Sequence, residues 1–225
     1  MIELADLLGR TPSSVALKMT NLASYDQKLK IRGIKGMKNT SKLDGQVWEE
    51  FLNNWENLVY EAQLILYKRK QIQLYKKTSF LESDNLLLGQ YQEQLSKVRI
   101  GQSFFRISVL NAYNKRCCIT GLDQVELLIA SHIKPWKDCD IKTERTNPSN
   151  GLCLNAFHDK VFDRGLITID QNYKIIISKK LKLASMDENT KDWIKGYENK
   201  EIMLPDKFIP DKDFIQYHND MIFQR

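Results

Sequence analysis

The amino-terminal part of the chain repeats apolar residues with a helical period. In "LADLLGRTPSSVALKM" they recur every three or four positions on either side of Gly9, which predicts two short amphipathic helices joined by a glycine turn. Thr11 followed by Pro12 predicts the N-cap and first position of the second helix. The pattern fits either an ordinary helical hairpin or a helix-turn-helix. A helix-turn-helix would face DNA with Arg10, Ser13, Ser14 and Lys18.

A longer helical pattern follows from Val47 to about Tyr75. The segment "VWEEFLNNWENLVYEAQLILYKRKQIQLY" has no Gly or Pro, and its apolar stripe includes Trp48, Trp55 and Leu66. Such a stripe is typical of a core helix or of a dimer interface. "KKTSFLESDN" then breaks the period, so we place a domain boundary after residue 78.

The pattern of apolar and polar residues changes in the second half of the chain. Residues 89–116 have a helical pattern on both sides of Gly101, and short aliphatic runs follow: "VELLIASHI", "GLCLN", "GLITID" and "YKIIIS". Gly, Asn and Asp separate these runs, as is typical of short strands. The sequence therefore predicts an α+β protein whose amino-terminal part is helical.

Composition narrows the class of protein. The 225 residues are 42% hydrophobic and 28% charged, which is ordinary for a globular chain. No apolar run is long enough to span a bilayer, and no signal peptide is visible, so we expect a cytoplasmic protein without a membrane. The four cysteines are then expected to be free thiols. The net charge of +6 favours a polyanionic partner but does not separate DNA from RNA or an anionic membrane.

Candidate chemistry gathers between residues 131 and 164. The segment "NAFHDKVFDRG" alone combines an imidazole, two carboxylates and a guanidinium, which fits either an ion-paired surface helix or a site. Two of the three histidines, His132 and His158, lie in this region together with Asn150. A strand ending in His, a loop ending in Asn, a second strand and an acidic helix follow one another in the order of a ββα-metal site.

Three segments carry a resemblance to a known family. "GQSFFRISVLNAY", "RCCITGLDQVELLIASHIKPW" and "NPSNGLCLNAFHDKVFDRGLITID" resemble the HNH endonucleases, in particular their restriction-endonuclease branch. The amino-terminal "GRTPSSVALKMTNLASYD" and the tail from Gly196 onward resemble the same branch. The resemblance implies a helical, helix-turn-helix-like DNA-recognition region at 1–78 and an HNH nuclease domain at 79–225, with its core at 101–180 and a carboxy-terminal extension.

The resemblance assigns roles to individual positions. His132 matches the general base that activates water, and Asn150 matches the residue that fixes the loop and so orients this histidine. Asp159 matches a metal-binding position, and Asp163, four residues later, shares its helix face. These oxygen donors suit Mg²⁺ or Mn²⁺. Lys160 and Arg164, on the same helix, are expected to contact phosphate.

The sequence departs from the family pattern at several positions. Ser131 replaces a frequent metal ligand. His158 lies beside the expected metal position, and we count it among the catalytic residues, where it would bind the ion, donate to a phosphate or support Asp159. Many relatives carry a zinc knuckle, whose matching positions here are Cys117, Thr120, Asn155 and His158. Two ligands cannot close a tetrahedral site, so no structural zinc is expected.

These observations predict a metal-dependent DNA endonuclease of restriction type. The alternatives are a nuclease for RNA or for particular nucleic-acid structures, and a DNA-binding protein with a degenerate HNH site that no longer cuts. The expected partners are double-stranded DNA and a second copy of the chain, because a two-fold symmetric protein matches a palindromic target. A restriction-type function would add a cognate methyltransferase.

Overall fold

The computed structural model describes residues 1–34, 36–37, 40–77 and 90–225. Its contacts divide the chain into two units, Met1–Ile100 and Gly101–Arg225. The domain boundary predicted after residue 78 falls outside the described residues. None of the described helices combines the length and apolar character that crossing a lipid bilayer requires.

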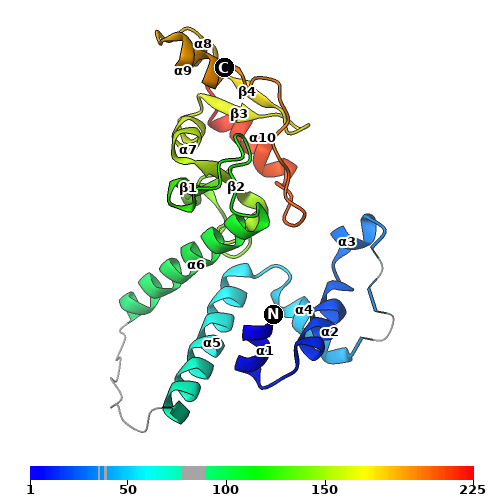
Figure 1. The fold of residues 1–225 in the computed structure, drawn as a ribbon. Helices are drawn as coiled ribbons and strands as arrows, with labels where there is room; N and C mark the ends of the chain where they lie inside the picture. The colour runs from blue at the N-terminus through cyan, green and yellow to red at the C-terminus, as the bar shows by residue number, and fades with distance from the viewer. Residues whose placement is uncertain (35, 38–39, 78–89) are drawn as a thin grey trace. The chain divides into compact units, whose positions relative to one another are not determined.

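The described part of the first unit is helical. Its helices are α1 (Ile2–Leu8), α2 (Pro12–Ala23), α3 (Gln27–Ile31), α4 (Lys42–Phe51) and α5 (Trp55–Lys77), as Figure 1 shows. Gly9 ends α1 in the left-handed region, at φ 63°, where a residue without Cβ is favoured. The Thr11 side chain accepts a hydrogen bond from the Ser14 amide and caps α2. The two helices and their turn therefore form as the sequence predicts.

The prediction of a single long helix from Val47 to Tyr75 is wrong, because the helix is interrupted between α4 and α5. The break lies at residues 52–54. The Asn54 side chain accepts a hydrogen bond from the Asn57 amide at 3.3 Å and so caps the first turn of α5. Asparagine competes with helical hydrogen bonding in this way, and it ends the pattern without any Gly or Pro.

The second unit is built around two antiparallel strands and one short helix. The second half of α6 (Gln90–Ala112) leads to β1 (Leu128–His132), which pairs with β2 (Gly151–Asn155) so that His132 faces Gly151. Helix α7 (Ala156–Asp163) follows β2 directly and packs against both strands. Short 3₁₀ turns at Val125–Leu127, Trp136–Asp138 and Pro148–Asn150 shape the connections. The fold is α+β, as predicted.

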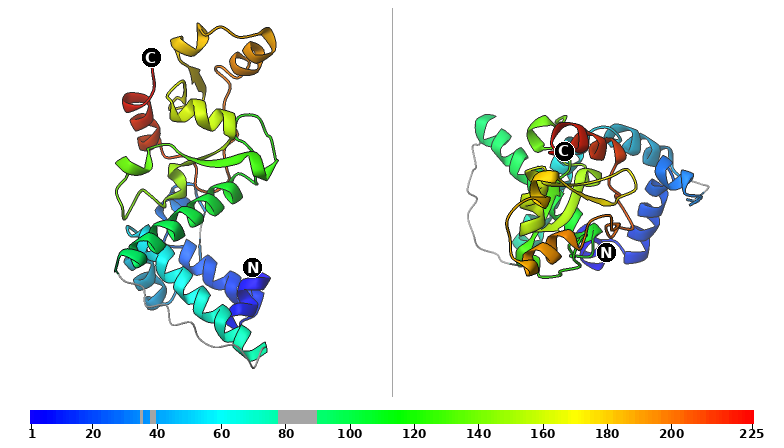
Figure 2. Two further views of the ribbon diagram at one scale, coloured as in Figure 1. Left: turned by 90° about the vertical axis from the view of Figure 1, so that its left-hand side faces the viewer. Right: turned by 90° about the horizontal axis from the view of Figure 1, so that it is seen from above.

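A second hairpin and three helices complete this unit. β3 (Ile167–Ile169) pairs with β4 (Ile175–Ile177), and α8 (Lys179–Lys182), α9 (Glu188–Lys195) and α10 (Lys212–Met221) follow. Helix α10, drawn in red in Figure 2, packs against β3. All five residues of β2 are buried, so this strand lies at the centre of the core. The buried core fixes the positions of β1 and α7.

Candidate active site

One cleft collects most of the residues that the sequence singled out. It measures about 570 Å³ and runs along β1 and α7. The structure brings together in its walls His132, Asp159, Lys160, Asp163 and Arg164. A histidine, two carboxylates and two cations therefore share one solvent-accessible space.

The imidazole of His132 is held in one orientation and one tautomer. Its Nε2 lies 2.9 Å from the backbone oxygen of Arg145. A carbonyl oxygen only accepts, so Nε2 carries the hydrogen and Nδ1 is the basic nitrogen. The ring of Phe105 stacks on the imidazole with centroids 3.6 Å apart, and Trp136 meets it edge-on at 5.5 Å. Burial lowers the pKa of His132 below its ordinary 6.5, which keeps the imidazole neutral at pH 7.

A glycine opposite His132 makes room for the stacked ring. A Cβ placed on Gly151 would lie 2.9 Å from Cζ of Phe105 and 2.4 Å from Cγ2 of Val109. Both are closer than packed carbon atoms approach one another. Any larger residue would therefore displace the side of α6 that supports the imidazole.

Asn150 is fully buried and joins the two ends of the loop that follows His132. Its Oδ1 accepts from the Lys134 amide at 2.8 Å, and its Nδ2 donates to the Lys134 carbonyl and to Sγ of Cys139. Its own carbonyl accepts from the Ile133 amide at 2.9 Å. Asn150 does not line the cleft. Its contacts instead hold the backbone immediately after His132.

The two carboxylates of α7 form a site of negative charge in the cleft. Burial raises the pKa of Asp159, and burial together with the charge of Asp159 raises the pKa of Asp163. The neighbouring Ser131 hydroxyl opposes part of the pKa shift at Asp159. Mutual repulsion of two carboxylates is the electrostatic condition that a divalent cation relieves. Within the described ranges no group of three or more His, Cys, Asp or Glu side chains is placed to hold a metal, so an ion here would take its remaining ligands from water and substrate.

Local sequence sets the length and direction of α7. The Asn155 side chain caps its start by accepting from the His158 amide at 2.9 Å. Gly165 follows its end at φ 65°, and a Cβ there would lie 2.0 Å from the carbonyl oxygen of Ile222. Glycine is therefore required by conformation and by space, and the carboxy-terminal segment packs directly on the end of the helix.

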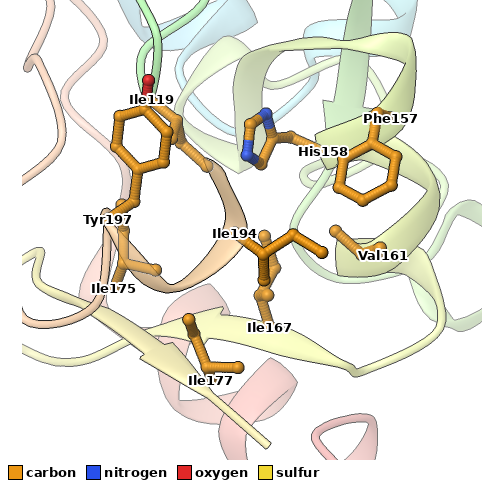
Figure 3. A pocket seen from close by; sticks show the side chains of 9 residues that line it. All are labelled: Ile119, Phe157, His158, Val161, Ile167, Ile175, Ile177, Ile194 and Tyr197. Carbon is orange, nitrogen blue, oxygen red and sulfur yellow. The ribbon is translucent and has the colours of Figure 1, made fainter. Parts of the chain in front are cut away.

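His158 does not reach the cleft, although the sequence placed it among the catalytic residues. It is 4% exposed, and Figure 3 shows its imidazole among apolar side chains on the other face of α7, including Ile119, Phe157 and Val161. Its Nδ1 donates to Oδ1 of Asn155 at 3.1 Å. Burial lowers its pKa to about 4. These contacts give His158 a packing role.

A polar network occupies the positions where relatives carry zinc ligands. Nδ2 of Asn155 donates to the Thr120 hydroxyl at 3.4 Å, while its Oδ1 accepts from His158. Cys117, the remaining one of these positions, is buried, and it forms no disulfide with another cysteine among the described residues. Side-chain hydrogen bonds therefore connect the segment after Cys117 to the start of α7.

The residues predicted to contact DNA from the first unit have different surroundings. Arg10, Ser13 and Ser14 are exposed. Lys18 instead forms an ion pair with the buried carboxylate of Asp44 at 2.7 Å, and this contact lowers the pKa of Asp44. Lys18 thus connects α2 to α4.

Sequence reasoning missed Phe105 and the carbonyl of Arg145. Phe105 lies in "GQSFFRISVLNAY", a segment that carried the family resemblance, but its contact with His132 joins residues from different elements. The Arg145 contribution is a backbone atom, so residue type gives no signal for it.

Residues 117–170 match the model of the HNH endonuclease family. The match contains β1, the loop that ends at Asn150, β2 and α7. This part of the chain is therefore similar in sequence to the HNH endonucleases, and it includes the β1 and α7 residues that line the cleft.

The chain is also similar to a solved structure, a modification-dependent TagI restriction endonuclease. The identity is 20% and the TM-score is 0.34, over 52% of this chain and 37% of that one. The similar region thus spans little more than a third of that protein. None of the curated proteins compared with the chain matches it.

Proposed function

We propose that the protein is a metal-dependent DNA endonuclease of restriction type, in which His132 activates the attacking water. The observation that carries this proposal is the single cleft that holds His132, Asp159 and Asp163. The net charge of +6 supports a polyanionic substrate. The restriction type rests on the resemblance of the amino-terminal and carboxy-terminal segments described above.

His132 would act through Nδ1. The hydrogen bond from Nε2 to the Arg145 carbonyl leaves Nδ1 as the nitrogen that takes a proton from water. The same bond stabilises the imidazolium that forms, because a carbonyl dipole faces the new positive charge. Phe105 and the loop secured by Asn150 hold the ring still during this transfer.

Asp159 and Asp163 would hold one Mg²⁺ or Mn²⁺. Their raised pKa values and their position in one solvent-accessible cleft fit a cation that is coordinated by carboxylate oxygens and water. When bound, such an ion supplies Lewis-acid stabilisation of charge on the phosphate oxygens. Asp159 and Asp163, which line the same cleft as His132, would hold this ion.

Lys160 and Arg164 would bind the phosphate backbone. Both lie on the cleft face of α7 and are exposed, so each can reach a phosphate without first giving up a buried contact. A guanidinium binds phosphate in a forked geometry, whereas the lysine acts as a point charge. Their positive charge offsets the two aspartates and admits a polyanion to the cleft.

Plasmid cleavage tests the proposal. Purified protein should nick or linearise supercoiled DNA with Mg²⁺ or Mn²⁺ and leave it intact with a chelator. Asp159→Ala and Asp163→Ala should each weaken Mn²⁺ binding in calorimetry and slow cleavage, while Asp170→Ala, in the turn between β3 and β4 and outside the cleft, serves as the control. DNA that stays intact with either metal would refute the proposal, and cleavage of RNA alone would transfer it to the RNA alternative.

A further inference from the structure

A second cleft adjoins the first on the opposite side of His132. It measures about 220 Å³ and lies between α6 and β1, lined by Gln102, Phe105, Arg106, Ile129, Ala130, His132 and Trp136. Ile129, Ala130, His132 and Trp136 also line the first cleft. The two clefts therefore border the same side chains around the proposed base, and we name the second one the flanking cleft.

Arg106 is prepared to bind an anion in the flanking cleft. Its Nη1 donates to the backbone oxygen of Leu128 at 2.9 Å, which orients the guanidinium and leaves its other N–H groups available. The residue is exposed, and no carboxylate in the described parts of the chain forms an ion pair with it. Gln102 lies one helical turn earlier on the same wall and adds an amide donor.

The flanking cleft differs from the first cleft because its wall has no acidic residue. The first cleft contains two aspartates, whereas the wall of the flanking cleft has one arginine and no acidic residue. A phosphate can therefore bind here without a metal ion. The apolar and aromatic part of the wall, Phe105, Ile129 and Trp136, suits the sugar and base that a nucleic-acid phosphate carries.

We infer that the flanking cleft binds a phosphodiester next to the scissile one, with Arg106 as its principal ligand. This inference rests on the proposed function, because it assumes that a nucleic-acid strand occupies the first cleft. The strand would pass around His132, with the scissile phosphate beside α7 and its neighbour beside α6. Arg106 would thereby fix the register of the strand relative to the base.

Salt-dependent binding gives the first test. A fluorescent DNA duplex of about 30 base pairs and mixed sequence is titrated with protein in chelator between 50 and 200 mM salt. Loss of one phosphate contact lowers the slope of log K against log salt by about 0.9. Arg106→Gln should show this decrease and a several-fold weaker affinity. Arg116→Gln, which removes an exposed arginine 3.8 Å from Asp123, should change neither.

A charge-conserving variant separates binding from a structural role. Arg106→Lys keeps the positive charge but loses the forked contact geometry. It should retain most of the salt slope that Arg106→Gln loses. If Arg106 serves only to hold the Leu128 backbone, both variants would unfold at a lower temperature. Neither would then change the slope of log K against log salt, and that result would overturn the inference.

Single methylphosphonate substitutions near a mapped cut site give the second test. Neutralising the phosphate that Arg106 contacts should slow cleavage by the wild type about tenfold. The same substitution should not slow cleavage by Arg106→Gln, and at every other phosphate the two proteins should respond alike. An identical interference pattern in both proteins would overturn the inference while the proposed function stands. A wild type that cuts nothing would refute the proposed function, and the salt slope would still decide the role of Arg106.

Discussion

The residues around His132 set the tautomer, the orientation and the pKa of its imidazole. The Arg145 carbonyl selects its tautomer, and Phe105 covers one face of the ring. Burial lowers its pKa, partly opposed by the hydrogen bond to Arg145. A histidine that remains neutral below pH 6.5 is available as a base throughout the neutral range.

The cleavage rate should therefore depend on pH in a defined way. Only neutral His132 accepts a proton, so the single-turnover rate at saturating Mn²⁺ should rise with pH, reach half its plateau below pH 6.5 and stay flat above pH 7. Phe105→Leu exposes the ring to water and should move that midpoint upward, with about a tenfold lower plateau. Phe104→Leu, on the same helix, is the control. A wild-type midpoint above 6.5, or no shift in Phe105→Leu, would contradict this description of the base.

At the scale of elements, α7 has two faces with separate tasks. Asp159, Lys160, Asp163 and Arg164 face the cleft, whereas Phe157, His158 and Val161 face an apolar cavity. The second face holds the first in place. Protonation of His158 would destabilise this second face, because it would put a positive charge among the apolar side chains shown in Figure 3.

His158 should make the protein less stable in acid. Its pKa is about 4 in the folded chain, against about 6.5 in an unfolded one. The unfolded chain then binds more protons as pH falls from 6.5 to 4, so stability is complete above pH 6.5 and is lost below it. The expected loss from this group at pH 5 is about 2 kcal/mol.

Urea unfolding at pH 7 and pH 5 measures this effect. His158→Gln cannot take up the proton, so its free energy of unfolding should fall less between the two pH values than that of the wild type. The buried His218 titrates in the same direction in both proteins and cancels in the comparison. Equal losses in the two proteins would show that His158 is not the group responsible.

The sequence predicted elements better than it predicted their contacts. Both strands of the β1–β2 pair and helix α7 follow from local pattern and the chemistry of turns. The break before α5 was missed because Asn54 caps the start of α5 through a side-chain hydrogen bond, and no Gly or Pro marks the position. The sequence did not show that His158 lies away from the cleft, because adjacent positions on a helix face different directions. The Phe105 stack depends on long-range packing, which no local pattern encodes.

At the scale of the whole molecule, the proposed nuclease function would give each chain one active site. Cutting both strands then needs two modules or two successive events, and we predict a homodimer. The stripe of Trp48, Trp55 and Leu66, which fits either a core or a dimer interface, is divided between α4 and α5 in the structure. Light scattering at micromolar protein, with and without DNA, should give twice the monomer mass. A monomer in both conditions that only nicks plasmid would exclude the dimer.

The most direct test of the central claim compares cleavage and binding in a single variant. His132→Ala removes the proposed base but none of the residues proposed to bind phosphate or metal. Its single-turnover cleavage rate should fall by about 10²–10⁴-fold, while DNA affinity, measured on the same preparation by gel shift, should stay within about threefold because the base contacts water and not the backbone. Cleavage by His132→Ala at near the wild-type rate would contradict the assignment of His132 as the catalytic base.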